Sequence, residues 1–128
     1  MSQDYLTIMM EMQDKLNSAV GLSQERALKM SEEELSKWIR NYNAALQAES
    51  SEVWEAASGR WWRDTPKNWK ENVEEEAVDC LHFLMSVFLL LGMDAKKVYE
   101  VYYKKNKKNF ERPDWHHHSL DDKEVSNA

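Results

Sequence analysis

The sequence predicts an all-α protein, and three observations support this fold class. Glycine occurs three times and proline twice, so the two residues that most often interrupt helices are scarce. Runs of β-branched residues, which are typical of strands, are absent, whereas Lys, Glu, Ala, Leu, Met and Trp are common. Apolar residues recur three and four positions apart, which is the spacing of one helix face. We therefore expect a bundle of four to five helices.

The first two long helices are bounded by capping residues. One is expected over residues 4–20, because Gly21 is a typical helix stop. The connector that follows has room for a short helical turn. The next helix is expected over residues 31–57, because Ser31 followed by Glu34 has the pattern of a capping box.

The last two helices have equally clear start signals. The third is expected to open at Thr65 and Pro66, since proline is favoured in the first helical turn, and to reach Leu91. The fourth is expected to begin after Asp94 and to end at Pro113. Together these segments form one domain over residues 1–115.

The third helix predicts that the bundle is completed by oligomerisation. From Cys80 to Leu91 it is apolar on almost every side. In so small a protein such a helix exposes apolar surface unless another subunit covers it. The simplest assembly is a homodimer, with a tetramer as the alternative.

Charge and cysteine content restrict the class of protein. The formal net charge of −6 argues against a nucleic-acid partner. A single cysteine excludes an internal disulfide and fits a reducing compartment. The first residues lack the pattern of a signal peptide, and the apolar run from Cys80 to Met93 is too short to span a bilayer. We expect a cytoplasmic protein with no membrane partner.

Two acidic pairs are the strongest functional signal. Glu49 and Glu52 lie three residues apart in one expected helix, and Glu76 and Asp79 lie three apart in the next. At least three of these carboxylates fall on or beside the apolar packing faces of their helices. Buried carboxylates are costly unless a cation compensates their charge. All-oxygen ligation predicts Mg²⁺, or Mn²⁺ as a substitute.

Two other segments stand out in the sequence. Gln13 and Asn17 share a helix face, which by itself is most simply explained as a solvated edge. Trp61 and Trp62, with Arg63, form an aromatic and basic connector. This connector is either a flap over the core or a wall beside a planar, anionic ligand.

The fourth helix becomes strongly basic towards its end. The basic residues of this cluster are Lys104, Lys105, Lys107, Lys108 and Arg112. They either bind phosphate groups or complement the dipole of the helix.

The tail, residues 116–128, is expected to be polar and loose, and we do not expect its three histidines to form a native metal site.

These motifs together resemble one enzyme superfamily, the all-α nucleoside triphosphate pyrophosphatases, which comprises MazG-like enzymes and dimeric dUTPases. The resemblance covers roughly residues 3 to 112 and is most specific for the dimeric dUTPase branch. Its motifs occur in the family's order: Gln13 with Asn17, Glu49-x-x-Glu52, Trp61-Trp62-Arg63, Glu76-x-x-Asp79, His82-Phe83, and Lys105-Asn106-x-x-Asn109-x-x-Arg112.

The resemblance implies Mg²⁺-dependent hydrolysis of dUTP to dUMP and pyrophosphate, with attack of water at the α-phosphorus. The four carboxylates would hold the metal ions, and Glu49 would act as general base. The phosphates would be bound by Lys105, Asn109 and Arg112, and Arg63 would also contact the substrate. The base and sugar would be framed by Gln13, Asn17, Trp61, His82 and Phe83.

The motif departs from the family after Arg112. Pro113, Asp114 and Trp115 follow where the family usually has Gln and then Gly-Tyr. The chain therefore resembles a compact relative, such as a phage-type enzyme, in which the base preference is open. One alternative keeps the chemistry but takes dCTP or a broad range of nucleotides. A second alternative is a non-enzymatic helical oligomerisation module whose acidic pairs are solvated.

Overall fold

The computed structural model of the chain describes residues 4–112 and contains helices and no strands within that range. The element order is α1 (Tyr5–Ala19), α2 (Gln24–Ala27), α3 (Glu32–Ala56), α4 (Trp69–Leu90) and α5 (Ala95–Glu111). The all-α prediction is confirmed, with the expected short turn present as α2. Pro113, the predicted domain boundary at residue 115 and the tail with its histidines lie outside the described residues.

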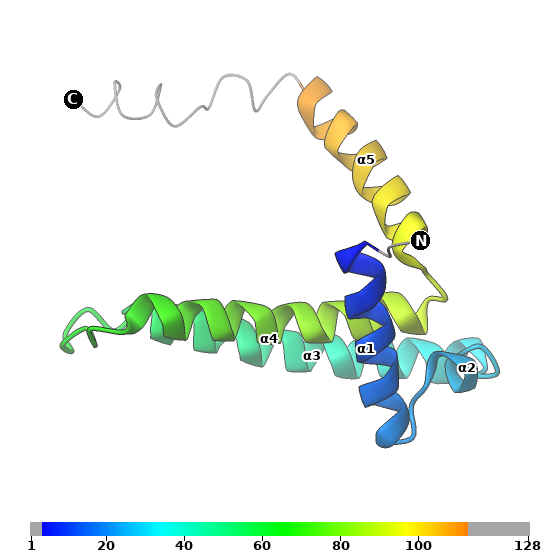
Figure 1. Cartoon of the computed structure of the whole chain (residues 1–128), viewed down its shortest axis with the longest axis horizontal. Coiled ribbons are helices and arrows are strands. Elements are labelled where there is room, and N and C mark those ends of the chain that lie inside the picture. Colours follow the sequence, from blue (N-terminus) through cyan, green and yellow to red (C-terminus); the bar gives the residue numbers. More distant parts are fainter. Residues whose placement is uncertain (1–3, 113–128) are drawn as a thin grey trace. The chain divides into compact units, whose positions relative to one another are not determined.

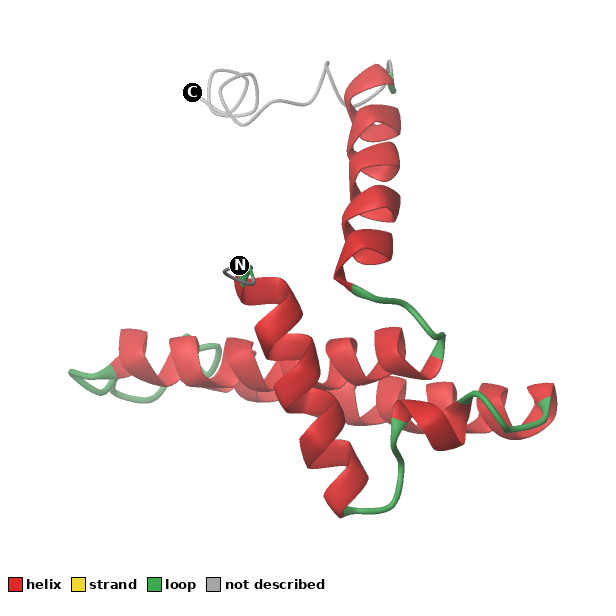
Figure 2. Ribbon diagram, turned by 45° about the vertical axis from the view of Figure 1, so that its right-hand side comes forward, coloured by secondary structure: helices red, strands yellow, loops and turns green. Residues whose placement is uncertain are grey.

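The chain divides into two compact units, Met1–Ala95 and Lys96–Ala128. In the first unit α3 and α4 run side by side as a long antiparallel pair, and α1 crosses them (Figures 1 and 2). The helix α2 follows α1 directly and contacts α4. The described part of the second unit is the helix α5.

The caps predicted for the first helices are present. The Asp4 side chain accepts a hydrogen bond from the Thr7 backbone N–H at 2.8 Å, which caps α1. The Ser31 hydroxyl accepts one from the Glu34 N–H at 3.1 Å and caps α3. α1 stops before Gly21, whose φ of +86° lies in the left-handed region that glycine adopts easily.

The start of α4 differs from the prediction. The helix begins at Trp69 rather than at Thr65 and Pro66, and its N-cap, Asn68, makes no side-chain capping bond. The Thr65 hydroxyl instead accepts a hydrogen bond from the Ser58 hydroxyl at 2.9 Å. Thr65 thus forms a hydrogen bond within the connector between α3 and α4 and does not cap α4, so the connector is longer than the sequence predicted.

The hydrophobic core of the first unit is small. One cluster joins Leu22, Ala27 and Leu90, with residues of α3 such as Trp38 and Ile39 packed against it. Towards the other face of α4 the residues Met10, Met85 and Leu89 are also buried. The core therefore lies where α1 and α2 cover the C-terminal half of α4.

Apolar side chains remain exposed where α1 crosses α4. Met12 is 66% exposed, Leu16 is 56% and Val78 is 49%. A groove of about 320 Å³ runs between them, lined mostly by methionine and aliphatic side chains. Oligomerisation, which the apolar sequence of the third helix predicts, stays a prediction.

No single helix in residues 4–112 is long and apolar enough to cross a membrane, although α4 and α5 taken together as a broken span meet that test by length and composition.

The cap of α3 gives a testable prediction. Ser31→Ala removes the acceptor for the Glu34 N–H, and we expect it to lower the free energy of unfolding by about 1 kcal/mol. Ser50→Ala, an exposed position inside the same helix, is the matched control and should change it by less than about 0.5 kcal/mol. Urea denaturation followed by circular dichroism measures both, and equal values for the two variants would contradict the capping role.

Candidate functional site

A cavity of about 470 Å³ opens between three helices of the first unit. Ligand pockets for small molecules have volumes of this order, and this one combines apolar walls with several converging polar groups. The helices α1, α3 and α4 all contribute. The lining residues are Gln13, Leu16, Asn17 and Val20 from α1, Tyr42 and Glu49 from α3, and Asp79, His82, Phe83 and Ser86 from α4.

Helical spacing explains why these side chains meet. On α1 the amides of Gln13 and Asn17 are one turn apart, so they project in the same direction. On α3, Tyr42 and Glu49 are seven residues apart and therefore lie on one stripe of the helix. On α4, the four lining residues are spaced by three, one and three positions, which also defines one stripe. The sequence thus brings polar side chains to the same faces that pack the helices together.

At one side of the cavity three carboxylates from two helices converge. Glu49 on α3 and Glu76 and Asp79 on α4 each offer an oxygen, and these oxygens lie within 4.8 Å of one another. Glu49 and Glu76 are half-buried, and Asp79 is exposed. The fourth predicted ligand, Glu52, is not in this group.

The electrostatics of the carboxylate group follow from its crowding. Partial burial raises the pKa of Glu76, and the negative charges of Asp79, Glu52 and Glu49 raise it further. Glu52 therefore acts on the group through its charge. Burial and the carboxylates of Glu49, Asp79 and Glu76 likewise raise the pKa of the Cys80 thiol. Oxygen donors gathered with unbalanced negative charge are the set that a hard divalent cation binds.

The amides of α1 belong to a buried hydrogen-bonded chain. The Gln13 Nε2 donates to Asn17 Oδ1 at 2.9 Å, and Asn17 Nδ2 donates to the Ser86 Oγ at 3.2 Å. The Ser86 hydroxyl in turn donates to the backbone carbonyl of His82 at 2.9 Å. Gln13, Asn17 and Ser86 are 8%, 7% and 2% exposed, so the solvated-edge explanation of the amide pair is wrong.

Aromatic rings form the opposite wall of the cavity. Tyr42 and Phe83 pack with ring centroids 6.2 Å apart, and Trp38 lies behind Tyr42 at 6.3 Å. Burial raises the pKa of the Tyr42 phenol. The motifs did not select Tyr42 or Ser86. For Ser86 a signal existed, because it is a polar residue inside the apolar run of the third predicted helix.

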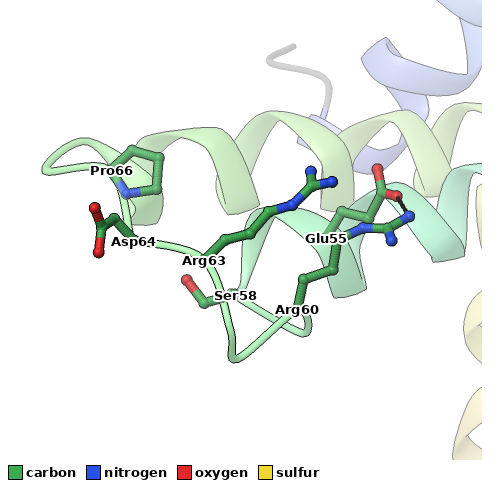
Figure 3. Close-up of a pocket in the computed structure, with 6 residues that line it drawn as sticks. All are labelled: Glu55, Ser58, Arg60, Arg63, Asp64 and Pro66. Atoms are coloured by element: carbon green, nitrogen blue, oxygen red, sulfur yellow. Dashed lines mark hydrogen bonds and ion pairs between the residues drawn. The ribbon is translucent and has the colours of Figure 1, made fainter.

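The connector between α3 and α4 forms a second, separate cavity of about 310 Å³ (Figure 3). Arg63 lines this cavity and does not line the larger one. Arg60 donates to the Glu55 carboxylate at 2.7 Å and also lies over the Trp54 ring, 5.8 Å from its centroid. Trp61 packs edge-on against its neighbour Trp62 and is 82% exposed. Substrate binding by Trp61 and Arg63 stays a prediction.

The predicted phosphate-binding residues lie in the second unit. Lys105 and Asn109 are four residues apart on α5 and exposed, which places them on one face of that helix. Arg112 directly follows the end of α5 and is also exposed. Their role in binding phosphate stays a prediction.

Two phage proteins with sequences related to this chain are named dCTP pyrophosphatases. The chain is 36% identical over 75 residues to a dCTP pyrophosphatase of Enterobacteria phage T4. This alignment covers 53% of the chain and 44% of the phage protein. The chain is 27% identical over 105 residues to a dCTP pyrophosphatase of Enterobacteria phage LZ5, covering 63% of this chain and 61% of the relative. The chain thus spans about half the length of these relatives. No solved structure matches it.

A family model described as dUTPase matches residues 5–92. This match contains every residue that lines the large cavity and all four predicted carboxylate ligands. The match spans well over half of the chain, and the described residues have the helical architecture that the motifs implied. The chain therefore belongs to the all-α dUTPase family.

Proposed function

We propose that this chain is a nucleoside triphosphate pyrophosphatase that hydrolyses a pyrimidine deoxynucleotide to its monophosphate and pyrophosphate. One observation carries the proposal: a single cavity is lined both by carboxylates of the acidic group and by the amides and aromatic rings predicted to read a nucleoside. Family membership supports the same chemistry. The oligomerisation-module alternative does not account for a cavity with this lining.

The nucleoside occupies the end of the cavity formed by α1 and the later part of α4. Gln13, Asn17 and His82 supply polar groups for the base edge. Phe83 packs under the sugar and offers a 2′-hydroxyl no hydrogen-bonding partner, which favours deoxyribose. A buried polar reader discriminates strongly because an incorrect base leaves one of its groups unpaired.

The triphosphate extends towards the acidic group. Glu49, Glu76 and Asp79 would hold Mg²⁺ there, with Glu52 adding negative charge, and the ion would supply positive charge to offset that of the triphosphate. Glu49 takes a proton from the water that attacks the α-phosphorus, and pyrophosphate leaves. Glu49 lines the cavity whereas Glu52 does not, which favours Glu49 as the general base. In the second unit, Lys105 and Arg112 would bind phosphate through their positive charges and Asn109 through its amide N–H groups.

Two substrates are supported by different observations. The family description supports dUTP, whereas the names of the phage relatives support dCTP. Uracil and cytosine differ in the order of hydrogen-bond donor and acceptor at ring positions 3 and 4. Both substrates require the same carboxylates, so the choice between them lies with the amides.

We also propose that two copies of the chain associate. Met12, Leu16 and Val78 leave apolar surface exposed along the α1–α4 groove, and burial of such surface favours association.

A substrate panel tests the proposed reaction. We expect Mg²⁺-dependent release of pyrophosphate from dUTP or dCTP and little from UTP, because the Phe83 ring, which we propose packs under the sugar, offers a 2′-hydroxyl no hydrogen-bonding partner. Release is measured with dUTP, dCTP, dTTP and UTP, each with Mg²⁺ and with EDTA. Release from none of the four would contradict the proposed function and favour the oligomerisation module.

The role of Glu49 is tested by substitution. Glu49→Gln removes a ligand and the proposed base, and we expect kcat to fall by at least about 10²-fold while the helical circular dichroism spectrum is retained. Glu74→Gln is the matched control, because Glu74 is an exposed carboxylate on α4 outside the acidic group. Near-normal turnover by Glu49→Gln would show that the acidic group is not the reaction centre.

The raised pKa of Glu76 predicts how Mg²⁺ stabilises the fold at different pH values. Without a cation, the Glu76 carboxyl loses its proton at a lower pH in the unfolded chain than in the folded chain, because folding raises its pKa. The free energy of unfolding therefore falls as the pH rises from the ordinary carboxyl pKa through the raised pKa of the folded state. Mg²⁺ binds the deprotonated form, so it should raise Tm more at pH 7.5 than at pH 4.5. Thermal melts of wild type and Glu76→Gln check this. A Tm increase of equal size at both pH values in the wild type would contradict it.

A further inference from the structure

We propose that Ser86 is a specificity-determining positioning residue: it fixes which way the Gln13 and Asn17 amides face and thereby selects between cytosine and uracil. This inference rests on the proposed function and deepens it. Ser86 is 2% exposed on α4, lines the large cavity, and bonds to Asn17, which is 69 positions away in the chain.

The direction of the hydrogen-bonded chain is set at its last member. The backbone carbonyl of His82 can only accept, so the single hydrogen of the Ser86 hydroxyl is committed to it at 2.9 Å. Towards Asn17 the same hydroxyl can therefore only accept. Asn17 must turn its Nδ2 to Ser86, as it does at 3.2 Å.

The same constraint fixes the orientation of the Gln13 amide, which we propose contacts the base. With Nδ2 turned to Ser86, Asn17 presents its Oδ1 to Gln13 and can only accept there. Gln13 must then donate through Nε2, which it does at 2.9 Å. The Gln13 Oε1 and the second Nε2 hydrogen are the polar groups that this chain of bonds does not use. The order of donor and acceptor along Gln13 is thus fixed by a backbone carbonyl two side chains away.

A fixed amide discriminates where a rotating one does not. Uracil presents a donor at N3 and an acceptor at O4, whereas cytosine presents an acceptor at N3 and a donor at N4. An amide that can exchange its oxygen and nitrogen by rotation pairs with either base. One whose orientation is fixed pairs with one base and leaves an unpaired polar group against the other, which is costly in a buried site.

The test is Ser86→Ala, which removes the hydroxyl with almost no change of volume and no loss of helix propensity. We expect the ratio of kcat/KM for the preferred base over the other, dUTP against dCTP, to fall by about tenfold, mainly because the disfavoured base is accepted better. Ser18→Ala is the matched control. The Ser18 hydroxyl makes the same kind of bond to a backbone carbonyl four residues earlier, at 2.7 Å, but it is exposed and outside the chain of bonds.

A second measurement reports on the amides without nucleotide. In wild type the side-chain NH₂ protons of Asn17 should exchange slowly with solvent by NMR, and in Ser86→Ala they should exchange faster by at least about tenfold. Unchanged exchange would overturn the proposal.

The kinetic outcomes separate the two proposals. A wild type that is active and a Ser86→Ala variant with an unchanged ratio would overturn the role of Ser86 and leave the proposed function intact. An equal fall of kcat/KM for both nucleotides would show a merely structural role and overturn it too. A wild type that releases pyrophosphate from neither nucleotide would overturn the proposed function, and the base-reading role with it.

Discussion

Repulsion between three neighbouring carboxylates, two of them half-buried, is the constraint on which the candidate site depends. Glu49 on α3 and Glu76 and Asp79 on α4 approach within 4.8 Å, although like charges in partly desolvated surroundings oppose such an approach. The long antiparallel packing of α3 against α4 holds them there (Figure 1). The helix pair therefore holds an unfavourable charge arrangement beside a cavity, and the cation that we propose would relieve it.

The fold class and the faces of the helices followed from local rules in the sequence. Ser31 and Asp4 cap their helices because a side-chain oxygen beside an unpaired backbone N–H acts within one turn. The stripe that places Glu49 at the packing face of α3 follows from the helical period. Such short-range rules need no knowledge of the tertiary structure, which is why they succeeded.

Features set by contacts between distant residues were not predictable in this way. Thr65 has the sequence of an N-cap, but its partner is the Ser58 hydroxyl across the connector, so α4 begins at Trp69. Ser86 stands out as polar in an apolar run, yet its role depends on α1 lying against α4, which no spacing rule reveals. Gln13, Asn17, His82 and Phe83 line one cavity together with Glu49 and Asp79, and their roles there stay predictions.

The buried chain of hydrogen bonds has a further consequence for the base-reading role that we propose for it. Gln13, Asn17 and Ser86 form a series in which each member dictates the donor or acceptor face of the next. Replacing Gln13 alone leaves the new side chain facing an Asn17 oxygen whose orientation it cannot change. Substitutions at these three positions therefore combine non-additively, and a redesigned base reader must be built as a set of three.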